Sequence, residues 1–377
     1  MRASSVLILC LLVSLTIGCN VETPTESASV SDNLFDLPPS KTPPGKQVRF
    51  TQVTAARRYA QYNYDLQIPS GDLGFTGRHI KVLIPDVAES RRLACLFYNP
   101  AGATVFTGKS AGTASTDPIL PYVNAGFAVV VYGTDGGTVE LTGQTSAKVL
   151  AQQAHLYGLS HAGLVNGRNA IDFALKEFPS IDEKRLFAIG HSSGGKQALL
   201  LAAADSRIAG CVAFAPACDI SKEESEMLTK LRHYQRSLPV SFLEQANPMA
   251  FADRLTVPTL VVYSTQDEVV SAADIVRFGQ AVGSNIEVRQ VSAPDHFRLP
   301  ELAFGIAQSW LSRNASQGAL PITTVKNSNE LSIATHLGRS STSNRSSERN
   351  SVIGESKPSP PRTPASQDGV RVNPYAR

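Results

Sequence analysis

The chain has 377 residues, of which 42% are hydrophobic and 18% charged, and its formal net charge is +3. This composition is typical of a globular protein with a hydrophobic core, and the length allows one large domain or two ordinary ones. The net charge is small, and no basic helix or zinc-type spacing occurs, so we expect no nucleic-acid partner.

The N-terminal residues MRASSVLILCLLVSLTIGC have the pattern of a secretory signal peptide. Arg2 precedes an apolar run from Val6 to Ile17, which is too short to cross a bilayer and is followed by small residues. The end of this run resembles a bacterial lipobox, with Thr16 where Leu is usual, and the resemblance implies a lipid on Cys19. We predict a leader over 1–19 and a bacterial envelope protein, either lipid-anchored through Cys19 or secreted to the periplasm or the exterior.

Composition divides the remainder of the chain into three parts. Residues 20–47 are rich in Pro, Ser and Thr and predict a linker. Residues 314–377 contain eight Lys and Arg against four Asp and Glu and have few large apolar side chains, so we predict a disordered basic tail. The part between them, 48–313, is predicted to be one domain.

Within 48–313, short apolar runs alternate with segments of helical periodicity. The predicted strands are 78–85, 93–100, 127–133, 185–190, 209–216, 258–264 and 286–291. The predicted helices are 145–159, 163–178, 196–204, 273–282 and 302–311. Strands that alternate with helices predict an α/β domain with a doubly wound, mostly parallel sheet, whose functional crevice lies at the carboxyl ends of the strands. Residues 219–246 follow one of these strands and predict a short helical insertion that caps the crevice.

The sequence Gly190-His-Ser-Ser-Gly194 fits the pattern G-x-S-x-G between a predicted strand and a predicted helix. This context is that of a nucleophile elbow, a sharp turn that needs small neighbours around the serine. Ser192 has Gly two positions before and two after it, whereas Ser193 does not. We therefore predict Ser192 as the nucleophile, and Ser193 as the donor of a backbone N–H to an oxyanion.

A serine hydroxyl needs a base and an orienting carboxylate, which follow the serine in the order acid, then histidine, in this type of fold. Asp267 follows the predicted strand 258–264, and His296 follows the strand 286–291. His296 is the histidine that comes after both the elbow and the acid within the domain. Glu268 is an alternative to Asp267, and His191 is expected to support the site rather than to act as the base.

These motifs resemble the α/β-hydrolase superfamily over about residues 78–312. The resemblance implies a sheet of the eight-stranded type and a second oxyanion donor on the loop after the strand 93–100. Relatives often have His-Gly-Gly-Gly at this loop, where the present chain has Asn99-Pro-Ala-Gly102. The donor is therefore expected to be Ala101, with Gly102 as an alternative.

The segment 247–270 is similar to dienelactone-hydrolase-like, polyester-hydrolase-like and prolyl-oligopeptidase-like enzymes, which usually have Gly where Ser264 stands. The resemblance implies a monomeric serine esterase for small or polymeric ester substrates, with no cofactor and no metal. The alternatives are a peptidase or amidase that uses the same residues, and a non-catalytic envelope binding protein. A disulfide between Cys211 and Cys218 is left open.

Overall fold

The computed structural model describes residues 33–39, 43–51, 58–66, 78–86, 92–102, 110–136, 146–221 and 240–317. Its strands are β1 (Gly45–Thr51), β2 (Tyr59–Leu66), β3 (His79–Pro85), β4 (Leu93–Asn99), β5 (Ala128–Tyr132), β6 (Ile181–His191), β7 (Ile208–Phe214), β8 (Thr259–Tyr263) and β9 (Ile286–Gln290). Its α-helices are α1 (Leu120–Asn124), α2 (Ala147–Leu159), α3 (Leu164–Glu177), α4 (Ser193–Ala204), α6 (Val240–Ala246), α7 (Ala272–Val282), α8 (Leu299–Leu302) and α9 (Phe304–Gln317). Three short 3-10 helices are η2 (Asp117–Ile119), η4 (Pro248–Arg254) and η5 (Gly283–Asn285).

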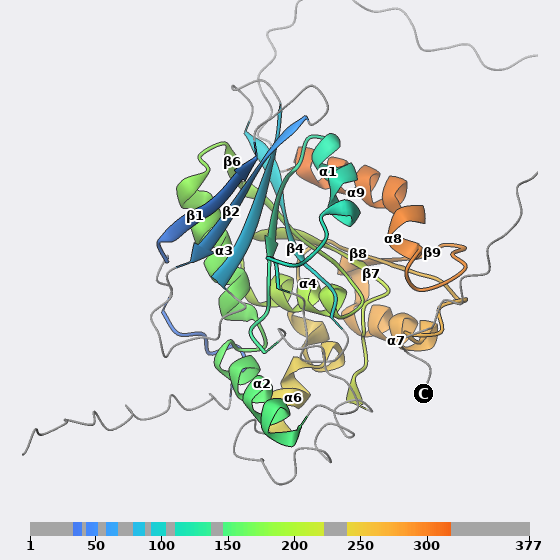
Figure 1. Cartoon of the computed structure of the whole chain (residues 1–377). Coiled ribbons are helices and arrows are strands. Elements are labelled where there is room, and N and C mark those ends of the chain that lie inside the picture. The colour runs from blue at the N-terminus through green and yellow to red at the C-terminus, as the bar shows by residue number, and fades with distance from the viewer. Residues whose placement is uncertain are drawn as a thin grey trace, which may run out of the picture. The chain divides into compact units, whose positions relative to one another are not determined.

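The nine strands form one sheet in the order β1-β2-β3-β5-β4-β6-β7-β8-β9 (Figure 1). The pairs β1–β2, β2–β3 and β3–β5 are antiparallel, and every later pair is parallel. The prediction of a doubly wound, mostly parallel sheet is confirmed. Within the described residues the sheet has nine strands rather than eight, and the two strands at its N-terminal edge, β1 and β2, were not predicted.

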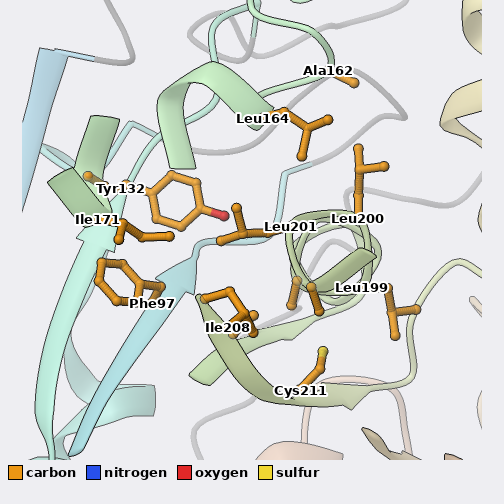
Figure 2. Packing of buried hydrophobic residues seen from close by; sticks show 14 of the residues in the cluster. Phe97, Tyr132, Ala162, Leu164, Ile171, Leu199, Leu200, Leu201, Ile208 and Cys211 are labelled. Carbon is orange, nitrogen blue, oxygen red and sulfur yellow. The ribbon is translucent and has the colours of Figure 1, made fainter. Parts of the chain in front are cut away.

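Helices cover both faces of the sheet, because the central strands are apolar on both sides. Phe97 of β4 and Tyr132 of β5 belong to the cluster formed with α3, α4, α6 and α7, whereas Tyr98 and Val131 belong to the cluster formed with α1 and α9. Side chains of successive strand residues point to opposite faces, so strands buried on both sides are continuously apolar. Figure 2 shows the first cluster, in which Phe97 and Tyr132 lie against side chains of α3 and α4.

The folded body begins before residue 48, so the predicted linker boundary is wrong. Leu34 is fully buried in the core, its N–H donates to Gln245 Oε1 (3.0 Å), and its carbonyl accepts from His161 Nδ1 (3.0 Å). Phe35 packs edge-on against Phe251 of η4. Apolar side chains in this otherwise polar stretch anchor it to the domain, because their burial removes apolar surface from water.

The C-terminal boundary also differs, since α9 continues to Gln317, four residues beyond the predicted end at 313. The remainder of the predicted tail, the leader and Cys19 lie outside the described residues. Of the predicted cap at 219–246, the structure describes α6, whose Phe242 is buried in the core against Tyr157 of α2. The described helices include none that is long and apolar enough to span a membrane.

Candidate active site

The register of the parallel strands brings the predicted site residues to one edge of the sheet. Asn99 of β4 pairs with Gly190 of β6, and Gly190 pairs in turn with Ala213 of β7. Strands β8 and β9 continue the ladder from β7. The loops that follow β4, β6, β8 and β9 therefore leave the sheet at its carboxyl edge, where ligands bind in open α/β sheets.

Ser192 lies at the junction between β6 and α4 in a strained backbone conformation. Its φ is 57° and its ψ is −125°, a conformation that residues other than glycine rarely adopt. Such strain costs about 1–3 kcal/mol and persists only where the surroundings enforce it. Here the Ser192 N–H donates to Phe214 O (2.9 Å), and the Ser192 carbonyl accepts from Lys196 N–H (3.0 Å). The turn has the geometry of a nucleophile elbow.

Two glycines of the G-x-S-x-G motif are required by close backbone contacts. A Cβ on Gly190 would lie 2.1 Å from the carbonyl oxygen of Gly194, and a Cβ on Gly194 would lie 2.2 Å from the carbonyl oxygen of Asn99. A larger residue at 190 would distort the elbow itself, and one at 194 would push the elbow away from the loop after β4. The motif is therefore explained by the packing of this turn.

Asp267 and His296 meet as predicted. His296 Nδ1 lies 2.7 Å from Asp267 Oδ2, and both side chains are almost completely buried. Asp267 Oδ1 accepts hydrogen bonds from the N–H groups of Val269 (2.8 Å) and Val270 (2.9 Å). The contact uses Nδ1 of the imidazole, so Nε2 is the nitrogen available to accept a proton from a serine. Glu268, the alternative acid, is exposed.

The electrostatics of this pair favour an ionised carboxylate. Burial of Asp267 by itself raises the pKa of the carboxyl, but the hydrogen bonds from His296, Val270 and Val269 outweigh burial and hold that pKa below its ordinary value. A negative Asp267 favours the tautomer of His296 with its proton on Nδ1, and it would stabilise an imidazolium if Nε2 accepted a proton.

His191 connects the elbow to the loop after β9 that carries His296, called the histidine loop below. Its Nε2 donates to the carbonyl of His296 (3.0 Å), and the two imidazole rings lie 4.3 Å apart between centroids. Burial, together with repulsion from His296, lowers the pKa of His191 to about 3. His191 is therefore neutral near pH 7 and holds the loop of the base, which agrees with the supporting position expected for it.

Ser264 links the loop after β8 that carries Asp267, called the acid loop, to the histidine loop. Sequence reasoning missed this function. Its buried Oγ donates to Ala293 O (2.9 Å) and accepts from the N–H of Gln266 (3.1 Å). Ala293 lies three residues before His296. The available signal was the replacement of the glycine usual in relatives by a side chain that can form hydrogen bonds.

Of the two candidate oxyanion donors on the loop after β4, Gly102 is not supported. The Gly102 N–H donates to Ser193 Oγ (2.8 Å), so this amide is already engaged. Ala101 remains, beside the backbone of Gly194 at the elbow. Asn99 begins the loop and is anchored by its own side chain, whose Nδ2 donates to Tyr132 O (3.1 Å) and to Thr134 Oγ1 (3.0 Å).

The three described cysteines, Cys95, Cys211 and Cys218, are buried and free, so the disulfide left open above is not formed. Burial raises the pKa of each thiol well above its ordinary value, which keeps the thiols protonated and poorly nucleophilic. Among the residues that the structure describes, no group of three or more His, Cys, Asp and Glu side chains could hold a metal ion.

Comparison with known proteins agrees with this geometry. Residues 166–299, which contain the elbow, Asp267 and His296, match the model of the prolyl oligopeptidase family. Acetyl xylan esterase from Paenibacillus sp. R4 has a similar structure, with a TM-score of 0.55 and 16% identity over 72% of this chain and 89% of that chain. The chain has the α/β-hydrolase fold.

Two further structures show the same fold. Acetyl xylan esterase 1 from Thermoanaerobacterium sp. JW/SL YS485 has a TM-score of 0.53 and 16% identity over 72% of the present chain and 88% of its own chain. S-formylglutathione hydrolase from Agrobacterium tumefaciens has a TM-score of 0.51 and 14% identity, with coverage of 72% and 99%. No curated protein sequence matches the chain significantly. At these identities the structural similarities establish the fold, and the reaction has to be argued from the site.

Proposed function

We propose that this α/β-hydrolase is a serine esterase that cleaves carboxylic esters through an acyl-enzyme on Ser192. The observation that carries the proposal is the strained conformation of Ser192 at the elbow. The preceding residue, His191, is hydrogen-bonded to the loop that carries His296, and His296 is in turn paired with Asp267. A serine hydroxyl is activated by an imidazole that a carboxylate orients, and His191 ties the loop of such an imidazole to the elbow that carries Ser192.

In the first half of the proposed reaction, His296 Nε2 takes the hydroxyl proton of Ser192 while Oγ bonds to the carbonyl carbon of the ester. The carbonyl electron pair moves onto oxygen, where the N–H groups of Ser193 and Ala101 stabilise the negative charge. The tetrahedral intermediate then collapses: the bond to the alcohol oxygen breaks, and His296 gives its proton to that oxygen. The products of this half are an alcohol and an acyl ester of Ser192.

In the second half, His296 Nε2 takes a proton from a water molecule whose oxygen attacks the acyl carbon. A second tetrahedral intermediate forms and collapses, the bond to Ser192 Oγ breaks, and the proton returns to that oxygen. The carboxylic acid leaves and the free serine is restored.

Two observations bear on the bond that is cleaved. Two acetyl xylan esterases and an S-formylglutathione hydrolase share this fold with TM-scores above 0.5, so an ester is the first substrate class to test, although these similarities establish the fold alone. The match to the prolyl oligopeptidase family model favours a second candidate, a peptidase that uses the same side chains.

The test uses a fluorophosphonate probe, p-nitrophenyl acetate and butyrate, and aminoacyl p-nitroanilides. An esterase labels with the probe and turns over the esters much faster than the anilides, and Ser192→Ala abolishes both activities. Faster turnover of the anilides would favour the peptidase. Labelling that persists in Ser192→Ala would refute Ser192 as the nucleophile, and a wild type that neither labels nor turns over would favour a binding protein.

We further propose that the protein is carried to the bacterial envelope by its leader and anchored there through a lipid on Cys19. The support is the apolar run that ends in LTIGC. In bacteria expressing the full chain, metabolic labelling with an alkyne fatty acid should mark the wild type and not Cys19→Ser. If neither protein is labelled, the lipid anchor on Cys19 is refuted and secretion without an anchor is the remaining explanation of the leader.

A further inference from the structure

The hydroxyl of Ser193 bonds to both backbone groups of one residue on the loop after β4. Ser193 Oγ accepts from the Gly102 N–H at 2.8 Å and donates to the Gly102 carbonyl at 3.2 Å. Ser193 is the first residue of α4, and Gly102 lies 91 positions earlier in the chain. The side chain of the residue that follows Ser192 therefore joins the nucleophile elbow to the loop after β4, residues 99–102, which we call the oxyanion loop.

The loop is held at two points on either side of Ala101. Asn99 is anchored by its side-chain bonds to Tyr132 and Thr134, and its carbonyl packs against Gly194 of the elbow. The second anchor is Gly102, whose backbone N–H and carbonyl both bond to Ser193 Oγ. Pro100 has no N–H, so between the two anchors the Ala101 amide is the one N–H that no hydrogen bond within the described part of the chain engages.

An oxyanion hole accelerates a reaction because its donors are fixed before charge develops on the substrate oxygen. The distance between its two donors must be set by the fold. In this chain one donor is the backbone N–H of Ser193 and the other is on a loop from a different strand. A hydrogen bond from the side chain of the first donor residue to the residue after the second donor sets that distance directly.

We propose that Ser193 is a positioning residue: its hydroxyl fixes the Ala101 N–H in place as the second oxyanion donor. The proposal rests on the esterase function proposed above. It gives residue 193 two separable contributions, since its backbone N–H acts on the substrate and its side chain acts through Ala101. Replacement by Ala keeps the backbone donor and removes only the side-chain bonds to Gly102.

The experiment compares Ser193→Ala, Ser193→Thr and the control Ser160→Ala in the full chain. Ser160 is a matched control because its Oγ also bonds to two backbone groups, donating to Tyr157 O (2.9 Å) and accepting from Gly163 N–H (3.0 Å), at the end of α2. The measurements are kcat and KM for p-nitrophenyl acetate, the inhibition constant of an arylboronic acid, which forms a tetrahedral adduct on a serine oxygen, and thermal unfolding.

We expect Ser193→Ala to lower kcat by roughly 10- to 100-fold, less than the loss of a whole donor, with KM changed by less than about threefold. Binding of the boronic acid should weaken by a similar factor, because its adduct also uses the hole. Ser193→Thr keeps a hydroxyl and should retain most of the activity. Ser160→Ala should lose stability without losing kcat.

Four results would overturn the proposal. The first is an unchanged kcat in Ser193→Ala, and the second is an equal loss in Ser193→Ala and Ser193→Thr, which would indicate packing rather than the hydroxyl. The third is a lower kcat with unchanged binding of the boronic acid. In these three cases the wild type remains an active esterase and the proposed function stands. The fourth, a wild type without ester turnover or probe labelling, removes the esterase function and the positioning of Ala101 together.

Discussion

Replacing Asp267 with Asn tests whether this carboxylate sets the tautomer of His296. Asp267 Oδ1 accepts two backbone N–H groups, from Val269 and Val270, and Oδ2 faces His296 Nδ1. An amide NH₂ cannot face two N–H donors, so the Asn oxygen takes the backbone side and its NH₂ faces the imidazole. Nδ1 must then accept a hydrogen bond, and the proton moves to Nε2.

An imidazole protonated on Nε2 cannot take the proton of Ser192. We expect kcat for p-nitrophenyl acetate at pH 7 to fall by about 10³–10⁴-fold, which corresponds to about 4–5.5 kcal/mol of activation free energy. The midpoint of thermal unfolding should change little by comparison, because the backbone hydrogen bonds and the volume of the side chain are retained.

The chain offers a matched control for this substitution. Asp295 Oδ1 also accepts from the N–H groups two and three residues further on, those of Phe297 (2.8 Å) and Arg298 (2.9 Å), but its carboxylate is exposed. Asp295→Asn therefore makes the same chemical change beside the base without touching its Nδ1, and kcat should stay within about threefold of wild type. A loss of less than tenfold in Asp267→Asn, or equal losses in the two variants, would refute the assignment of Asp267.

Further predictions concern the elbow, the core and the loops. Gly194→Ala places a Cβ 2.2 Å from the carbonyl oxygen of Asn99, so it should slow fluorophosphonate labelling by at least tenfold and lower the unfolding midpoint. Leu34→Ala should lower the free energy of unfolding by roughly 2–4 kcal/mol in urea denaturation, and a loss below 0.5 kcal/mol would show that 33–39 is only a tether. Because the pKa of His191 is about 3 in the folded chain, its unfolded form binds a proton that the folded form rejects as the pH falls below about 6.5. Stability should therefore fall by up to about 1.4 kcal/mol per pH unit between pH 6.5 and 3, and His191→Gln should lose about 2 kcal/mol less than wild type between pH 7 and pH 5. Ser264→Ala frees the acid loop from the histidine loop and should lower kcat by roughly tenfold with KM nearly unchanged, whereas equal changes in both constants would indicate a general disturbance of the site.

The central strands and the contact between Asp267 and His296 could be predicted because both follow from local pattern and chain order. Strands buried on both faces are continuously apolar, and their carboxyl ends determine where the following loops lie. The edge strands β1 and β2 could not be predicted in this way. Both strands lack the continuous apolar run of the central strands, and most side chains of β1 are exposed. Residues 61–66 of β2 do alternate polar and apolar side chains (QYNYDL), which is the pattern of a half-buried strand, so β2 was within reach of the sequence and was overlooked.

Loops show a second limit of the sequence. The presence of two glycines and a serine predicts an elbow, but the partner of a polar side chain depends on which loop the fold brings to it. Gly102 was a reasonable donor from its place after β4, and only the contact with Ser193 shows that its amide is engaged. The same limit applies to Leu34, whose burial depends on contacts with residues more than a hundred positions away.

The distribution of hydrogen bonds explains how a strained serine and three separate loops stay in register. The elbow is bonded to the oxyanion loop through Ser193 and to the histidine loop through His191. The histidine loop is bonded to the acid loop through Ser264 and through Asp267 itself. Each loop leaves a different strand, and its position relative to the others is determined by one or two short contacts rather than by the sheet alone. The backbone bonds of Ser192 to Phe214 and Lys196 hold the strained residue itself, and the residues on either side of it connect the elbow to the two loops that carry the groups proposed to act with it.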